Sequence, residues 1–342
     1  MATTSIEFRP KKQAQEARER TEPGFTISYA TKASPDHPTR NEDTGQLIKA
    51  PEGEGFVIGI YDGASKGGPE GSGVKASRAA AAAAQENAAK LFGDPDKRGK
   101  YLRNVTADMN EAVKRNGEGG KTTMNVTLFE KLSENEGRVT SASIGDSPGF
   151  VINIEERTIE QFTVNDDPQQ EVDAALTAAG VEVPGGRLKK DTVLTPGILQ
   201  ALAAAGVEAV ELRLKHVMAS KECTREEALK ELEGNRGNVF LSVLPKSLGI
   251  EGKLEPHVTS RKIDLRKDIV LGCSDGIRDV LPDDYIVRTV IAALEAGDNP
   301  SQALINEVRK VRGAKPDDRL AIAVIPDQIK RRFEEAERTA VA

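Results

Sequence analysis

Four places in the sequence set an aspartate in a similar context, at the end of an apolar run or in a turn, next to a glycine or a second acid. They are Glu42-Asp43, Asp62-Gly63, Asp275-Gly276 and Asp317-Asp318. A single Asp-Gly is usually a turn. Strand ends hold side chains rigidly, and hard cations such as Mg²⁺ and Mn²⁺ take oxygen ligands. Four carboxylates that met would repel one another unless cations neutralised them, so together they predict a two-metal hydrolytic site.

The elements that must position these acids follow from the hydrophobic pattern. An apolar run over 55–61 predicts a buried strand that ends at Asp62, and an Ala-dominated stretch over 74–91 predicts a helix. A second helix over 96–116 precedes short strands expected at 122–129, 138–144, 149–154 and 158–164. Hairpin-linked strands with long helices on each side in the sequence indicate an α+β fold, with helix layers packed against sheet layers.

The chain is predicted to have one main domain with an insertion. Residues 1–23 are polar and charged and predict a flexible N-terminal arm. The main domain covers 24–326, and a stretch of about 168–236, rich in Ala, Leu, Glu and Lys, interrupts it as an inserted helical subdomain. The predicted elements outside the insertion also include strands at 25–30, 258–265, 268–273 and 320–325, helices at 282–294 and 301–312, and a C-terminal helix at 327–342.

Composition narrows the class of partner. The chain has 342 residues, with 48 Lys+Arg against 54 Asp+Glu and a net charge of -6, so no basic stripe indicates nucleic-acid binding. No apolar window approaches the roughly 20 residues of a spanning helix, which predicts no membrane insertion and no export. The two cysteines, Cys223 and Cys273, form no CxxC pattern and fit a reducing compartment. We expect a cytoplasmic monomer.

The motifs around the acids resemble those of the metal-dependent protein phosphatases, the PPM family of type 2C serine/threonine phosphatases. They occur in the family's order over about residues 25 to 326 and suggest a divergent member. The matching segments are Asn41-Glu42-Asp43, Gly59-Ile60-Tyr61-Asp62-Gly63, Lys121-Thr122-Thr123, Gly145-Asp146-Ser147, Phe162-Thr163-Val164-Asn165-Asp166, Asn238-Val239, Leu248-Gly249, Cys273-Ser274-Asp275-Gly276-Ile277-Arg278-Asp279 and Lys315-Pro316-Asp317-Asp318.

This resemblance implies a four-layer α-β-β-α sandwich with a central antiparallel β-sandwich, and it makes the helical insertion a flap. It implies hydrolysis of phosphoserine and phosphothreonine on proteins by a water that bridges two Mg²⁺ or Mn²⁺ ions. Asp62 would bridge the ions, the Gly63 carbonyl would bind one of them, and Asp275 and Asp317 would hold the other.

Further metal positions are implied with less direct roles. Glu42 and Asp43 would act partly through waters. Asp146 and Asp279 match positions that hold a third ion in some relatives, and the alternative is that they cap a turn and a helix start.

The sequence departs from the family at the phosphate-binding position. Pro38 stands where relatives carry an arginine four residues before the acidic Glu. Arg40 is the candidate replacement, because a guanidinium suits bidentate phosphate binding, with a solvated turn residue as the alternative. Arg78 and Arg236 are weaker candidates.

A second departure removes a histidine. Residues 64–68 read Ala-Ser-Lys-Gly-Gly where the family has His-Gly-Gly, and His37 is the candidate to compensate. Leu320 replaces a common threonine, with little expected effect. Because the phosphate arginine and the histidine are missing, two alternatives stay open beside a protein phosphatase: a phosphatase-like regulatory binding module with weak or no activity, and a phosphatase of small phosphoesters.

Overall fold

The computed structural model describes residues 5–8, 15–50, 55–65, 68–166, 168–183, 188, 192–237, 246–252, 254–312, 314 and 316–341. The chain divides into two compact units. Residues 1–165 and 247–342 form the first, here called the sandwich unit, and residues 166–246 form the second, the helical unit. Each is described by itself.

Two six-stranded sheets build the sandwich unit, and every strand pair in them is antiparallel. The first sheet has the order β1 (Ser5–Phe8), β4 (Thr44–Lys49), β5 (Gly55–Tyr61), β8 (Met124–Lys131), β9 (Glu136–Ile144), β12 (His257–Asp264). The second has the order β11 (Thr158–Gln161), β10 (Gly149–Asn153), β13 (Asp268–Cys273), β14 (Arg319–Pro326), β3 (Phe25–Lys32), β2 (Gln15–Glu22). A short pair, β6 (Gly63–Ala64) and β7 (Lys121–Thr122), follows the end of β5.

Central strands are buried on both faces, which explains their unbroken apolar runs. In β14 the alternate residues Leu320, Ile322 and Val324 belong to the core between the two sheets. Ala321 and Ala323, which point the other way, belong to the core under the helices. The strands therefore separate three apolar layers, one between the sheets and one outside each sheet.

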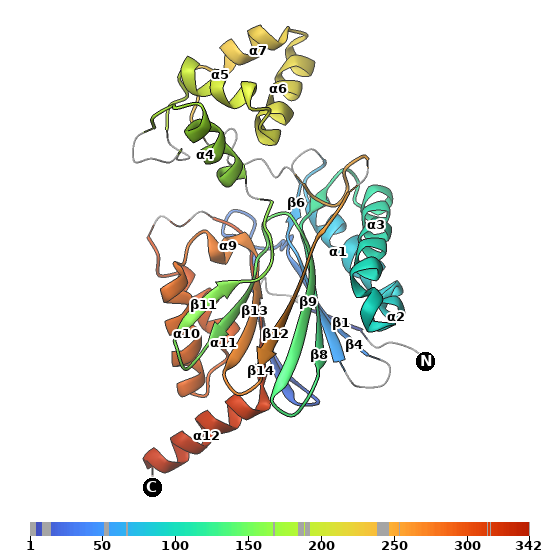
Figure 1. Cartoon of the computed structure of the whole chain (residues 1–342), viewed down its shortest axis with the longest axis vertical. Helices are drawn as coiled ribbons and strands as arrows, with labels where there is room; N and C mark the ends of the chain where they lie inside the picture. Colours follow the sequence, from blue (N-terminus) through green and yellow to red (C-terminus); the bar gives the residue numbers. More distant parts are fainter. Residues whose placement is uncertain are drawn as a thin grey trace. The chain divides into compact units, whose positions relative to one another are not determined.

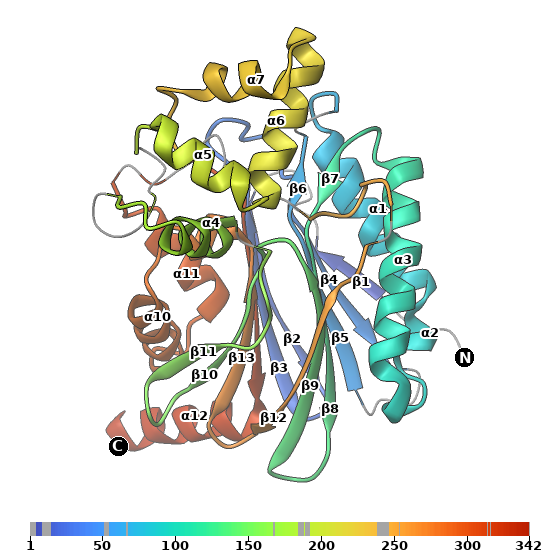
Figure 2. The same cartoon turned by 45° about the horizontal axis from the view of Figure 1, so that its top comes forward.

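Helices cover both outer faces of the sandwich unit (Figure 1). One set, α1 (Ser72–Glu86), α2 (Ala88–Leu91) and α3 (Arg98–Asn116), packs on the first sheet, and the 3₁₀ turn η1 (Pro95–Lys97) leads into α3. The other, α9 (Asp275–Arg278), α10 (Asp283–Glu295), α11 (Pro300–Val308) and α12 (Asp327–Val341), packs on the second. The small alanines of α1 are buried and let its backbone approach the sheet closely. The result is the predicted four-layer α-β-β-α sandwich (Figure 2).

The helical unit has its own apolar core. It contains α4 (Pro168–Ala178), α5 (Pro196–Ala204), α6 (Glu208–Lys221) and α7 (Arg225–Leu232). Thr224 and Glu227 form a capping box at the start of α7, which sets where that helix begins. The first and last residues of the helical unit, Asp166 and Lys246, form an ion pair at 2.9 Å between Oδ1 and Nζ.

The structure corrects two local predictions. Residues 1–23 were expected to form a flexible arm, but 5–8 and 15–22 are strands β1 and β2. Their charged residues suit edge strands, because each lies at the outer edge of its sheet. Strand β4 lies in a stretch that the turn-rich sequence did not predict as a strand. None of the helices that the structure describes is long and apolar enough to cross a membrane.

Candidate active site

Carboxylates from neighbouring strand ends meet at one end of the sandwich unit. Asp43 precedes β4 and Asp62 follows β5, and because Thr44 pairs with Tyr61 these two acids leave adjacent strands side by side. Asp275 follows β13 and Asp317 precedes β14, whose strands pair through Cys273 and Ala321. The β-ladders therefore bring together acids that are far apart in the sequence. Asp146 joins them from the turn after β9.

The mutual repulsion of these acids is visible in their pKa values. Burial raises the pKa of Asp62 well above its usual range, and the negative charges of Asp43, Asp275, Asp146 and Asp317 raise it further. Burial likewise raises the pKa of Asp43, with Asp318 as the next cause. Together, the residues Asp43, Asp62, Asp146, Asp275, Asp317 and Asp318 are called the acidic cluster from here on.

Asp43 is the clearest sign that this cluster lacks a positive partner. Its residue is 5% exposed, and neither carboxylate oxygen has a hydrogen-bond partner of good geometry. The Ser274 hydroxyl is near enough to lower its pKa, yet burial and the neighbouring acids outweigh it. Buried carboxylate oxygens without donors are suited to a hard divalent cation.

The cluster is not a closed metal cage. In the described part of the chain, no three His, Cys, Asp or Glu side chains are arranged so that they could hold one ion. The type and charge of the donors nevertheless fit divalent cations. The predicted ligands Asp43, Asp62, Asp275 and Asp317 are thus brought into one neighbourhood, and their role as ligands stays a prediction.

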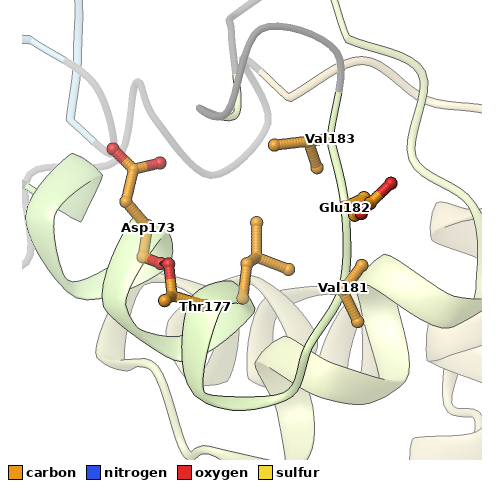
Figure 3. A pocket seen from close by; sticks show the side chains of 6 residues that line it. Asp173, Thr177, Val181, Glu182 and Val183 are labelled. Carbon is orange, nitrogen blue, oxygen red and sulfur yellow. Dashed lines mark hydrogen bonds between the residues drawn. The ribbon is translucent and has the colours of Figure 1, made fainter.

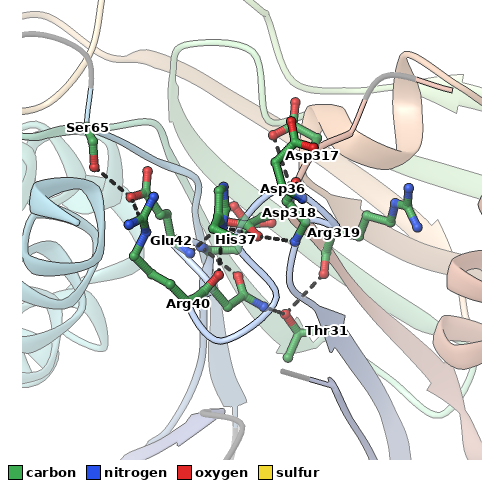
Figure 4. Close-up of polar contacts among 12 residues, drawn as sticks. Thr31, Asp36, His37, Arg40, Glu42, Ser65, Asp317, Asp318 and Arg319 are labelled. Atoms are coloured by element: carbon green, nitrogen blue, oxygen red, sulfur yellow. Dashed lines mark hydrogen bonds and ion pairs between the residues drawn. The ribbon is translucent and has the colours of Figure 1, made fainter. Parts of the chain in front are cut away.

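Asp318 orders the loops around the cluster, a role that the sequence did not reveal. Its Oδ1 accepts the Ser34 N–H and its Oδ2 accepts the Glu42 N–H, each at 2.7 Å. Figure 4 shows it between the loop of residues 34–42 and Asp317. Burial raises its pKa to about 6, although the two backbone donors and His37 oppose the shift. The only signal in the sequence was its place beside Asp317 before a strand.

A second set of hydrogen bonds fixes Asp62. The Asp62 N–H donates to the Thr123 hydroxyl at 3.0 Å, and the Thr123 N–H donates to the Asp62 carbonyl at 2.9 Å. Thr123 Oγ1 is also 2.7 Å from Ser147 Oγ, in the turn that carries Asp146. The Thr of the 121–123 motif therefore joins two parts of the acidic cluster.

The glycine after Asp62 is required by close packing. A Cβ atom on Gly63 would lie 2.4 Å from the Gly73 carbonyl oxygen and 2.5 Å from that of Glu42. No side chain fits there, so the backbone after Asp62 packs directly on the start of α1 and on the loop that carries Glu42 and Asp43, here called the acidic loop.

Glu42 and Arg40 lie beside the cluster and are occupied with each other. Glu42 Oε1 accepts the Ser65 hydroxyl at 2.6 Å and is 3.1 Å from Arg40 Nε (Figure 4). Arg40 Nη1 donates to Glu70 Oε1 at 2.6 Å. Glu42 is not among the charges that most raise the pKa of Asp43 or Asp62.

Asp279 is exposed at the far end of α9.

The other candidate residues fall into three groups. His37 lies near the site, with Nδ1 2.8 Å from the Arg40 carbonyl oxygen and 3.7 Å from Asp318 Oδ1. Arg78 is on α1, and Arg236 belongs to the helical unit. Lys66, Gly67, Asn238, Val239 and Lys315 lie outside the described residues.

Two cavities among the described residues are lined by side chains other than those of the acidic cluster. One of about 370 Å³ lies in the helical unit, where Figure 3 shows Asp173, Thr177, Val181, Glu182 and Val183 around it. A second, of about 650 Å³, is lined by residues that include Glu22, Lys49 and Phe129. Neither lining includes a member of the acidic cluster.

Comparison with known proteins identifies the fold. No model of a known protein family matches the sequence, and no curated protein matches it. Solved structures do match. The serine/threonine phosphatase of S. agalactiae is 16% identical with a TM-score of 0.59, covering 88% of this chain and 99% of that one.

Two further structures agree. The serine/threonine phosphatase Stp1 from Staphylococcus aureus is 18% identical with a TM-score of 0.56, covering 94% of this chain and 99% of that one. The serine-threonine phosphatase 2C from Toxoplasma gondii is 16% identical with a TM-score of 0.51, covering 91% and 98%. This chain therefore has the fold of the type 2C serine/threonine phosphatases, as the sequence motifs predicted.

Proposed function

We propose that this chain is a divergent member of the PPM family that hydrolyses phosphoserine and phosphothreonine esters of proteins, with Mg²⁺ or Mn²⁺ as cofactor. The observation that carries the proposal is the acidic cluster. Five separate segments place carboxylates in one neighbourhood of a phosphatase fold, and the buried oxygens of Asp43 have no hydrogen-bond donor of good geometry. Such a set of buried like charges destabilises the fold unless bound cations neutralise it, so its presence indicates a cation-dependent function.

The proposed roles follow the sequence prediction. Asp62, Asp275 and Asp317, with the Gly63 carbonyl, would hold two ions, and Asp43 would support them. Bound divalent ions supply positive charge for the phosphoryl oxygens and lower the pKa of a water molecule. A third ion would be held by Asp146 and Asp279, of which Asp279 is exposed.

The chain's own residues have two tasks. Thr123 and Asp318 hold the loops that carry Asp62 and Asp43 by the hydrogen bonds described above. Arg40 would bind the substrate phosphate in place of Glu70. Its ion pair with Glu70 is exposed and therefore weak, so the exchange costs little. No group in this arrangement needs to form a covalent bond to phosphorus.

The test uses the purified full chain. We expect hydrolysis of an aryl phosphate and of a phosphothreonine peptide in Mn²⁺ or Mg²⁺, and loss of turnover in EDTA. Calorimetric titration should show binding of Mn²⁺ to the wild type and weaker binding to Asp62→Asn. Metal binding without turnover of either substrate would favour the regulatory module, and turnover of the aryl phosphate alone would favour a small-ester phosphatase. We also propose a cytoplasmic monomer, which sedimentation and fractionation would test.

A further inference from the structure

Three cations meet on the other side of Asp317 and Asp318. Arg319 begins β14, and its register partner on β3 is Lys32. Arg309 is at the C-terminal end of α11, a helix that packs on both of these strands. Like charges directly opposite each other on a sheet are destabilising, so this placement requires an explanation.

Among these three residues, Arg319 is the most buried. It is 5% exposed, and its Nε has no hydrogen-bond partner. Figure 4 shows its guanidinium extending away from Asp317 and Asp318. Burying a cation without a partner is costly. If Arg319 served only to fill space, an apolar side chain of similar length would do so at lower cost.

No carboxylate lies within ion-pair distance of these cations in the described part of the chain, although Asp317 and Asp318 attract Arg319 at longer range. Within the described residues, Lys32, Arg309 and Arg319 form no ion pair closer than 4 Å with any acid. Burial lowers the pKa of Lys32, and the positive charges of Arg309 and Arg319 lower it further. Burial also lowers the pKa of Arg319, against the opposing effect of Asp317. The three groups therefore repel one another in the ligand-free chain.

We propose that Lys32, Arg309 and Arg319 form an oxyanion-binding subsite next to the acidic cluster, which takes a phosphate or carboxylate group. Lys32 is half-buried and Arg309 is exposed, so the anion would enter from their side and meet Arg319 at the bottom. A guanidinium offers several N–H donors in a planar fork, which suits such a group. The subsite does not depend on phosphatase activity.

The test measures binding of inorganic phosphate to the full chain in EDTA at low ionic strength by isothermal titration calorimetry. We expect one site whose Kd rises at least tenfold in Arg319→Met and in Arg309→Gln. Arg288→Gln removes an equal charge from α10, where Arg288 pairs with Asp284, and should leave the Kd unchanged. Arg40→Gln should also leave it unchanged, which separates this subsite from the proposed catalytic phosphate position.

Equal phosphate affinity in wild type, Arg319→Met and Arg309→Gln would overturn the subsite, as would loss of binding in Arg40→Gln alone. Since Arg309 is exposed, its variant keeps the test decisive if Arg319→Met does not fold. An acetylated glutamate-rich peptide then identifies the source of the anion. If it displaces phosphate, the subsite accepts acidic side chains of a protein chain; if it does not, free phosphate is the ligand.

Discussion

Glu42 and Asp43 are neighbours with buried carboxylates, yet their surroundings differ. Glu42 has the Ser65 hydroxyl and the Arg40 guanidinium as partners, whereas neither oxygen of Asp43 has a hydrogen-bond partner of good geometry. A compensated buried charge joins parts of the fold, and an uncompensated one destabilises it until a ligand brings the opposite charge. The comparison separates residues that maintain the acidic loop from residues that bind ions.

The largest expected effect is the loss of turnover when Asp62 of the acidic cluster loses its charge. Asp62→Asn should reduce metal-dependent turnover on the order of 10³-fold, because several kcal/mol of transition-state stabilisation depend on the ions and each 1.36 kcal/mol is tenfold in rate. Steady-state hydrolysis of a phosphothreonine peptide measures this. The control Asp108→Asn on α3 should keep the wild-type rate. Near-normal rates in Asp62→Asn would refute the site.

The two neighbours should respond in opposite directions when each loses its charge. In EDTA, Asp43→Asn should stabilise the fold by about 1–2 kcal/mol, since it removes a buried negative charge that the neighbouring carboxylates repel. Glu42→Gln should destabilise it by about 1–3 kcal/mol, since it weakens the contacts to Arg40 and Ser65. Urea unfolding in EDTA measures both. A change of the same sign in the two variants would break the comparison.

Stability should also depend on pH in a way that metal alters. The pKa of Asp318 is about 6 in the folded chain, above the value of about 3.9 for an unfolded Asp, and those of Asp43 and Asp62 are also raised. These groups therefore stabilise the metal-free fold fully below pH ~3.9, and this stabilisation is lost as pH rises through the folded pKa. For Asp318 alone the loss is about 2–3 kcal/mol.

Thermal unfolding between pH 4 and 8, with EDTA or with saturating Mn²⁺, measures this effect. We expect the Tm in EDTA to fall relative to the Tm in Mn²⁺ as pH rises, because bound cations favour the charged carboxylates. A constant difference across this range would show that the cluster does not bind the ion.

The smallest effect is expected at the exposed end of the compensated group. Glu70 is 84% exposed in its side chain, so Glu70→Gln should change unfolding free energy by less than about 0.5 kcal/mol. It should lower the KM for a phosphopeptide about two- to fivefold at constant kcat, since it frees Arg40. Kinetics with Glu86→Gln as the charge-matched control measures this. An unchanged KM would show that the pair with Glu70 does not limit phosphate binding by Arg40.

The sequence predicted the elements whose signal is local. Strand β5 and helices α1 and α3 came from apolar runs and helix propensity, and the acids at strand ends came from the same runs. Strand β4 was missed because its polar residues are satisfied by distant groups: buried Gln46 donates to the Ala81 carbonyl and accepts from Tyr61 Oη. Asp318 was missed as an organiser because its donors, on Ser34 and Glu42, lie more than 270 residues away in sequence.

The ion pair between Asp166 and Lys246 has a consequence for how this chain can be altered. Since it brings the side chains at the entry and the exit of the helical unit within 2.9 Å of each other, we expect that the intervening residues can be removed as one piece. A turn of a few residues would span that gap, so a shortened chain that rejoins the two ends should still fold its sheets. Evolution or protein engineering could therefore replace the segment between Asp166 and Lys246 without changing the strands that carry the acidic cluster.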